Sequence, residues 1–318
     1  MRLARISTPP RWCNGIAPQR RARVAGPRAA GDTSGAGAVL HGGGSVYSDP
    51  ALYDAAFCRY SGRDFAAEAA FLLRESAATS PAFLELACGP GRHAHAAAAL
   101  GARALGVDLS PSMVEYARAL EPRSAARFAV GDMSRLADCA DVAAGAPFDV
   151  ITCLFSSFTH LVAEGAALAC LRGAAAHLTR GGVIVLDLEH PRRLFDGSGR
   201  RGDGSDDWHV PTWDTFCEDG RALAVRWGAP GDAFDPLTQT LHRTVAMDVY
   251  TRGAPEPALA VRDVVPTRFF GVPELRLLAA AAGLRVVSEL GALREEGVAL
   301  ADARATRLVL LLARQDDV

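Results

Sequence analysis

The sequence Phe-Leu-Glu-Leu-Ala-Cys-Gly-Pro-Gly-Arg, residues 83–92, joins an apolar run to a glycine-rich turn. An Ala-rich stretch follows, and a second apolar run then ends at Asp108. This order predicts a buried strand, a tight turn, a helix and a second strand. Gly89 and Gly91 allow the backbone to approach a ligand where a Cβ atom would collide, and Asp108 is placed to accept hydrogen bonds from both ribose hydroxyls. The stretch therefore predicts a nucleotide-type site.

The identity of the nucleotide depends on the residues around this turn. Residues 89–94, Gly-Pro-Gly-Arg-His-Ala, also match the dinucleotide fingerprint G-x-G-x-x-G/A. Three neighbouring features favour a different ligand: Glu85 lies four residues before the first glycine, Asp132 follows another apolar run, and the apolar run 148–155 leads into the polar residues 156–160.

This ordered set resembles the motifs of class I S-adenosylmethionine-dependent methyltransferases, over roughly residues 45–318. The resemblance implies that residues 85–91 wrap the methionine part of the cofactor, that Asp108 holds the ribose and that Asp132 reaches the adenine amino group. Ala87 departs from the glycine that is more frequent there in the family. The cofactor-binding residues it implies are Glu85, Ala87, Cys88, Gly89, Gly91, Asp108, Leu109, Met113, Asp132, Met133 and Leu154.

The charge of these residues suits that cofactor. S-adenosylmethionine carries an ammonium, a carboxylate and a sulfonium but no pyrophosphate, so its site needs no helix N-terminus for phosphate. Three acids, Glu85, Asp108 and Asp132, predict a mildly anionic cradle, which the phosphates of a dinucleotide would resist. The alternatives are solvated turn acids, an NAD(P)-dependent Rossmann reductase, and a non-catalytic S-adenosylmethionine-binding module.

Composition indicates which kind of protein this is and which partners it lacks. The chain has 318 residues, 49% of them hydrophobic, and a net charge of −2, which predicts a globular protein with neither a nucleic-acid nor a membrane partner. Every basic residue is arginine, so arginine clusters carry little weight as nucleic-acid signals. The seven cysteines are odd in number and include no C-x-x-C pair, which predicts a reducing compartment and no structural zinc. Cys88 lies inside the turn motif, where we expect a small buried filler rather than the alternative, a reactive thiol.

Residues 1–44 differ from the rest of the chain. The first 31 contain seven arginines, no acid and no apolar core of a secretory signal. An acid-poor, arginine-rich leader predicts an organelle transit peptide, with chloroplast favoured over mitochondrion. The alternative is a disordered tail on a cytoplasmic protein. The Gly-rich residues 31–44 are expected to form a flexible join.

The remaining chain alternates strands and helices, which predicts a parallel sheet covered on both faces. The helices are expected at 50–60, 63–78, 91–100, 111–120, 163–179 and 272–282. The core strands are expected at 82–87, 103–108, 126–130, 147–154, 183–188, 285–290 and 306–313. Residues 191–207 are expected to form a mobile loop, and the β-like stretches 222–227, 238–250 and 259–269 to form an antiparallel insertion within about 208–270. The predicted fold is therefore α/β: a doubly wound, Rossmann-like, seven-stranded sheet, mostly parallel, in which the resemblance implies one antiparallel strand at the end of the chain.

Residues 52–68 and 155–161, with the insertion, are similar to a narrower group of small-molecule N-methyltransferases. These are the nucleotide-sugar amino-group dimethyltransferases, with the glycine-type enzymes more distant. The resemblance implies lead-in helices that lid the cofactor, a turn after the fourth strand that faces a small-molecule substrate, and inserted strands that roof the pocket or pair subunits in a homodimer. Sugar specificity does not carry over, and nitrogen and oxygen acceptors both stay open.

The candidate catalytic residues follow from position. His160 lies just past the fourth strand, where open α/β sheets bind ligands, and a histidine can take the acceptor proton or orient the substrate. Tyr53 matches the lid tyrosine of the similar enzymes. Glu189 and His190 follow the fifth strand on the same side. His93 and His95 lie two apart on a helix and point different ways, so we expect no metal pair there.

Overall fold

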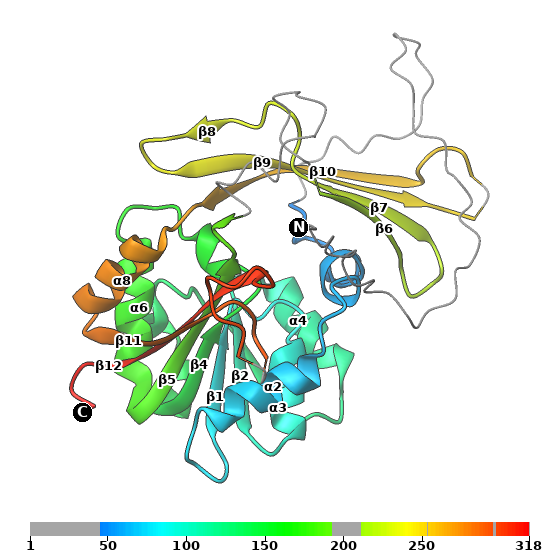
Figure 1. Ribbon diagram of the computed structural model, residues 1–318. Coiled ribbons are helices and arrows are strands. Elements are labelled where there is room, and N and C mark those ends of the chain that lie inside the picture. The colour runs from blue at the N-terminus through cyan, green and yellow to red at the C-terminus, as the bar shows by residue number, and fades with distance from the viewer. Residues whose placement is uncertain (1–44, 193–210, 253, 295–296, 318) are drawn as a thin grey trace, which may run out of the picture. The chain divides into compact units, whose positions relative to one another are not determined.

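The computed structural model describes residues 45–192, 211–252, 254–294 and 297–317, which form two β-sheets (Figure 1). The larger sheet has the strand order β11-β12-β5-β4-β1-β2-β3. Its strands are β1 (Ala82–Leu86), β2 (Arg103–Asp108), β3 (Arg127–Val130), β4 (Phe148–Cys153), β5 (Leu178–Glu189), β11 (Leu284–Leu290) and β12 (Arg307–Arg314). Its helices are α1 (Pro50–Tyr53), η1 (Asp54–Arg59), α2 (Phe65–Arg74), α3 (Arg92–Ala99), α4 (Pro111–Leu120), η2 (Leu136–Asp138), α5 (Ala140–Gly145), η3 (Ser157–His160), α6 (Ala166–His177) and α8 (Val272–Ala281).

Strand pairing confirms the predicted sheet. Strands β1 to β5 pair in parallel, and β12 pairs antiparallel with both β5 and β11. Apolar runs such as Ala82–Leu86, in which all five residues are buried, suit strands covered on both faces. The carboxyl ends of β1 to β5 consequently meet at one edge of the sheet.

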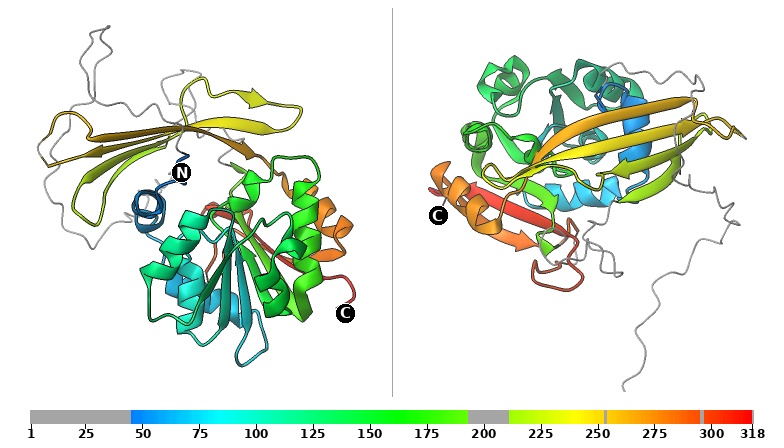
Figure 2. Two further views of the ribbon diagram at one scale, coloured as in Figure 1. Left: turned by 180° about the vertical axis from the view of Figure 1, so that it is seen from behind. Right: turned by 90° about the horizontal axis from the view of Figure 1, so that it is seen from above.

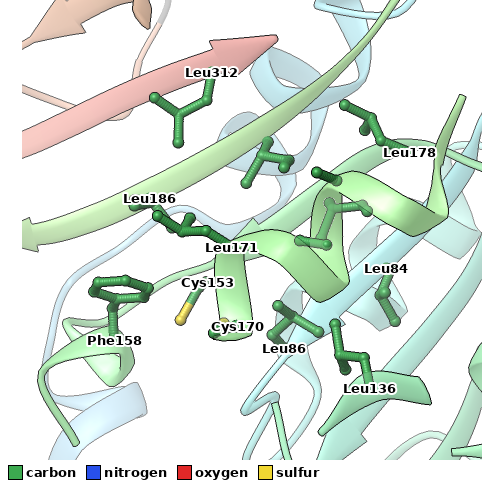
Figure 3. Packing of buried hydrophobic residues seen from close by; sticks show 14 of the residues in the cluster. Leu84, Leu86, Leu136, Cys153, Phe158, Cys170, Leu171, Leu178, Leu186 and Leu312 are labelled. Carbon is green, nitrogen blue, oxygen red and sulfur yellow. The ribbon is translucent and has the colours of Figure 1, made fainter. Parts of the chain in front are cut away.

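Two apolar clusters cover the two faces of this sheet. One contains residues of η2, α5, α6 and α8 packed on the sheet, and Figure 3 shows its centre around Cys153, Leu171 and Leu186. The other contains residues of α2, α3 and α4. Because side chains alternate along a strand, Leu84 belongs to the first cluster and Phe83 to the second. Glu85 therefore belongs on the α3 face.

Several predicted boundaries are confirmed. Strand 103–108 and helix 111–120 are found residue for residue. Asp49 and Ser110 cap helices α1 and α4, since each side chain accepts a hydrogen bond from a backbone N–H three residues on.

Other predictions need correction. The helix predicted over 50–60 is α1 followed by the π-helix η1. The fifth strand begins at Leu178 rather than Val183, because Leu178 pairs with Phe148 before a shift in register. Helix η2, helix α5 and the short helix η3 were not predicted; they are too short to show a periodic apolar pattern.

The insertion forms the second, antiparallel sheet, drawn in yellow and orange in Figure 2. Its strands are β6 (Thr212–Phe216), β7 (Ala222–Trp227), β8 (Phe234–Asp235), β9 (Thr240–Tyr250) and β10 (Leu259–Arg268), of which β6 and β8 were not predicted. Apolar residues of this sheet pack with Val46, Leu52 and Ala56 of the lead-in segment, residues 45–60. The leader (1–44) and the loop 193–210 lie outside the described residues. Within the described chain, no helix is long and apolar enough to cross a bilayer.

Candidate functional site

A cavity of about 1150 Å³ lies at the carboxyl ends of the parallel strands. Its floor is formed by the residues that follow β1, β2, β3 and β4 and by the end of β5, and its other walls come from residues 45–60 and from β6, β7, β9 and β10. Among the predicted site residues, it is lined by Tyr53, Ala87, Gly89, Asp108, Leu109, Met113, Asp132, Met133 and His160. The fold thus brings together most of the residues singled out in the sequence.

Asp108 holds the glycine turn and faces the cavity. Its Oδ2 accepts a hydrogen bond from Gly89 N at 2.8 Å, and its Oδ1 accepts one from Ser110 N at 2.9 Å. Burial raises the pKa of Asp108, although the two backbone N–H groups counteract this. Each carboxylate oxygen has a second lone pair, so the residue can still accept two hydroxyl hydrogen bonds.

The two glycines of the turn have different roles. Ala87 and Gly89 have φ values of 50° and 51° and both line the cavity. Gly91 is not on the cavity wall: a Cβ atom there would lie 2.3 Å from Phe128 Cε1. Close packing of α3 against β3 therefore accounts for this glycine, and its predicted ligand contact stays a prediction.

Glu85, Cys88 and Leu154 are buried and do not line the cavity. Glu85 accepts a hydrogen bond from Ala94 N at 3.0 Å and lies 3.2 Å from His93 Nδ1, so its carboxylate holds the start of α3. Burial raises the pKa of Cys88 well above its usual value, which fits the predicted buried filler. The expected three-acid cradle is thus reduced to Asp108 and Asp132, because Glu85 points into the helix face of the sheet.

The side of the cavity next to β2 and β3 is mixed in polarity. Asp132 Oδ1 accepts hydrogen bonds from Ser134 N and Oγ, which orients its carboxylate. Leu109 is 70% exposed although it is apolar, because it borders the cavity rather than a core. Met133 also lines this wall. Such a surface can hold a flat ring between apolar side chains and a carboxylate.

His160 is in contact with Tyr47 of the lead-in segment. Its Nε2 lies 3.2 Å from Tyr47 Oη, and the two rings meet edge to face. Burial lowers the pKa of His160, and a hydrogen bond to the Pro266 backbone offsets this only in part. His160 is therefore a neutral imidazole near pH 7.

Aromatic rings fill the lid side of the cavity. Tyr53 packs between Tyr47 and Phe57, with centroid distances of 5.4 and 4.9 Å. Phe57 in turn meets the edges of Trp213 and Trp227 from the second sheet. Burial raises the pKa of Tyr53 well above its usual value, so its hydroxyl stays protonated.

Two arginines lie in the wall formed by the second sheet. Burial lowers the pKa of Arg243 against the influence of Glu189 and Asp232, and its Nε has no hydrogen-bond partner among the described residues. Arg268 is paired with Glu274 at 2.5 Å and lies over the Phe270 ring. Glu274 thus balances the charge of Arg268, and the guanidinium of Arg243 is the positive group that this wall offers to an anion.

The other acidic and histidine residues considered in the sequence differ in their surroundings. Glu189 lines the cavity, whereas His190 is buried and binds Leu300 O and Arg192 N. His93 lies between Glu68 and Glu85, and His95 binds Ala117 O. In the part of the chain that the structure describes, no group of three or more His, Cys, Asp or Glu is placed for a metal ion.

Sequence reasoning missed part of the lining. Tyr47 lies beside the leader and has no motif of its own. Residues of the second sheet are separated from the strand ends by the loop 193–210, and no spacing rule relates them to the site. The cavity residues that were not named individually include Tyr47, Phe57, Trp213, Trp227, Arg243, Arg268 and Arg307.

Comparison with known proteins agrees with this geometry. Residues 83–182 match the protein family described as "Methyltransferase domain". The dTDP-3-amino-3,6-dideoxy-alpha-D-glucopyranose N,N-dimethyltransferase of Streptomyces fradiae is 33% identical over 129 residues, or 40% of this chain. The chain spans about half the length of that relative, 48%.

A second relative is matched over most of its length. The dTDP-3-amino-3,4,6-trideoxy-alpha-D-glucopyranose N,N-dimethyltransferase of Streptomyces venezuelae is 31% identical over 238 residues, which cover 71% of this chain and 85% of the relative. The fold is similar to that of an S-adenosylmethionine-dependent methyltransferase from Clostridium acetobutylicum, with a TM-score of 0.63, 17% identity and coverage of 83% and 96% of the two chains. The chain belongs to the S-adenosylmethionine-dependent methyltransferases.

Proposed function

We propose that this protein transfers the methyl group of S-adenosylmethionine to the amino nitrogen of a small acceptor, an amino sugar linked to a nucleotide. The observation that carries the proposal is the cavity: one end contains the strand-end acids Asp108 and Asp132, and another part contains a neutral His160. Its volume, about 1150 Å³, exceeds the 300–1,000 Å³ typical of pockets for one small molecule. It is large enough for a cofactor and an acceptor together.

The residues next to β1, β2 and β3 fit the cofactor. The unused lone pairs of Asp108 suit the ribose hydroxyls, and Leu109, Met133 and Asp132 form a wall for the adenine. The turn at Ala87 and Gly89 would receive the methionine part. In this arrangement Leu109, now 70% exposed, would be covered by the base.

The acceptor is assigned to the zone between His160 and the second sheet. Arg243 and Arg268 suit the phosphates of a nucleotide, since arginine pairs well with phosphate oxygens. Trp213 and Trp227 offer rings for stacking against a base or a sugar. The names of both relatives describe dTDP-amino sugars as substrates, which supports the same class of acceptor here.

S-adenosylmethionine supplies an activated methyl group, and the protein's main task is to hold the acceptor nitrogen in line with it. Positioning of this kind can lower a barrier by about 7–11 kcal/mol. A neutral His160 can accept the proton that an ammonium acceptor must lose before its nitrogen attacks. Tyr47, 3.2 Å from Nε2, holds the imidazole in place.

The test is a turnover assay with labelled S-adenosylmethionine and a set of dTDP-amino sugars, together with calorimetric titration of S-adenosylmethionine and NADH. We expect binding of S-adenosylmethionine and transfer of label to nitrogen. Binding of NADH alone would support the reductase alternative. Tight binding of S-adenosylmethionine with no demethylated product, in the presence of the sugars or of a metabolite extract, would support a binding module instead.

The organelle leader at residues 1–44 and the homodimer stay predictions. The two relatives come from Streptomyces, and the comparisons give no support to an organelle leader. A fluorescent protein fused to residues 1–44 and expressed in plant cells tests that leader: import into plastids would support it, and a diffuse cytoplasmic signal would contradict it. Sedimentation analysis tests the homodimer.

A further inference from the structure

Asp187 of β5 is fully buried, with 0% of its side chain exposed, and it lies between two arginines from distant parts of the chain. Arg307 Nε donates to Oδ1 at 2.6 Å, and Arg63 Nη1 donates to Oδ2 at 2.9 Å. Burial opposes ionisation, but Arg307 and Arg63 hold the pKa of Asp187 at about 2. The carboxylate is therefore charged, and each of its two oxygens is held by a different arginine.

The same residue binds the turn that follows β4. Phe155 N donates to Asp187 Oδ2 at 3.2 Å, and Ser156 N donates to Asp187 O at 2.8 Å. Arg307 adds a third contact, since its Nη2 donates to Ser156 Oγ at 3.0 Å. Asp187 and its partner Arg307 thus hold two backbone N–H groups and one hydroxyl of this turn.

The turn is strained. Phe155 and Ser156 are consecutive non-glycine residues with φ values of 55° and 64°, in the left-handed region that L-residues disfavour. Such conformations persist where the surroundings enforce them and are concentrated at functional sites. Arg63 also lies 4.3 Å above the Phe155 ring, which fixes the side chain as well as the backbone.

The turn leads directly to His160. Ser156 precedes helix η3 and caps it: Thr159 N and Oγ1 both donate to Ser156 O, at 2.9 and 2.7 Å. His160 is the last residue of that helix. A rotation of the turn would therefore carry the imidazole away from Tyr47 and the acceptor zone.

We propose that Asp187, held between Arg63 and Arg307, is a positioning residue: by enforcing the left-handed turn at Phe155–Ser156 it sets the place of His160 in the cavity. The proposal deepens the proposed function, on which its kinetic consequence rests. Asp187 itself does not line the cavity, so it acts only through the turn.

The experiment compares Asp187→Asn with Asp149→Asn. Asp149 is a structural carboxylate on β4 that accepts a hydrogen bond from Ala82 N and does not line the cavity. In Asp187→Asn we expect kcat to fall by about 10²-fold, the size expected of a small misplacement of a reacting group, with the Kd for S-adenosylmethionine within about twofold of the unmodified protein. Asp149→Asn should keep kcat.

Two further variants separate positioning from loss of fold. Ser156→Gly in the Asp187→Asn background should restore part of kcat, because glycine adopts positive φ without enforcement. In a His160→Ala background, Asp187→Asn should change kcat by less than about threefold, since contributions through one group are not additive. A rescue that fails, or fully additive losses, would overturn the proposal.

A readout independent of turnover is the NMR signal of the His160 ring, assigned by its loss in His160→Ala. We expect the signal to shift in Asp187→Asn, to return towards its original position with Ser156→Gly, and to stay in place in Asp149→Asn. An unchanged signal would overturn the proposal even if no acceptor is ever turned over, whereas a shift in an inactive protein would contradict only the proposed function.

Discussion

Tyr47 Oη and His160 Nε2 lie 3.2 Å apart, although 113 positions separate them in the chain. Tyr47 belongs to the segment that leads into α1, and His160 ends helix η3 after β4. Their contact links the lid side of the cavity to the floor formed by the strand ends. It also leaves His160 buried enough for its pKa to be lowered.

His160→Ala is expected to lower kcat/KM for an amine acceptor by about 10²- to 10⁴-fold, the contribution typical of a general base. The base is active only when neutral, and burial places its pKa below the usual value of about 6.5. In the pH profile of the unmodified protein, the midpoint of the acid limb should therefore lie below pH 6.5. In the variant this limb should be absent. A titration series of kcat/KM between pH 5 and pH 8 measures this, and a variant with the original profile would rule out the role.

Asp108→Asn is expected to weaken binding of S-adenosylmethionine. Hydrogen bonds to a charged group contribute roughly 1.5–3 kcal/mol, so loss of the charge should raise Kd by about one to two orders of magnitude. Calorimetric titration gives the value. Asp141→Asn, which removes an exposed partner of Arg127, serves as the control and should bind normally. An Asp108 variant with unaltered affinity would show that this carboxylate does not touch the cofactor.

Arg243→Gln is expected to raise KM for a nucleotide-linked amino sugar by about tenfold, because a partly buried arginine loses roughly 1.5–3 kcal/mol of charge-assisted pairing with phosphate. The Kd for S-adenosylmethionine should not change. Arg262→Gln, in the neighbouring strand β10, removes an exposed partner of Asp248 and is the matched control. The same loss of affinity for an amino sugar without phosphates would argue against an anion site.

Gly91→Ala is expected to destabilise the protein more than Gly62→Ala. Both glycines have positive φ, 70° and 64°, so each alanine pays roughly 1–2 kcal/mol for the left-handed backbone. Only at Gly91 does the added Cβ meet Phe128, at 2.3 Å, and such overpacking adds about 1–3 kcal/mol. Urea unfolding of the two variants measures the difference. Equal free energies of unfolding would mean that Phe128 moves aside without loss.

The sequence was most informative where local pattern and tertiary structure agree. Strand 103–108 and helix 111–120 were predicted to the residue because local features mark their limits: an apolar run that ends in an acid, and the residue pair Ser110-Pro111 that begins the helix. Asp108 was placed correctly because a strand end in a parallel sheet faces the ligand edge. Glu85 was expected beside the cofactor because it precedes the glycine turn, but it lies within β1 rather than at its end, and alternation turns its side chain to α3.

The amino-acid sequence by itself determined the parallel sheet, the glycine turn and the acids Asp108 and Asp132, because periodicity and turn chemistry act over a few neighbouring residues. Only the tertiary structure decided which side chains surround the acceptor zone. Tyr47, Trp227 and Arg243 reach that zone from segments far apart in the chain, Asp187 lies behind the cavity wall, and no short-range pattern encodes which of them meet. Packing of the lead-in segment and the second sheet determines those contacts, through burial and paired charges that exist only in the folded chain.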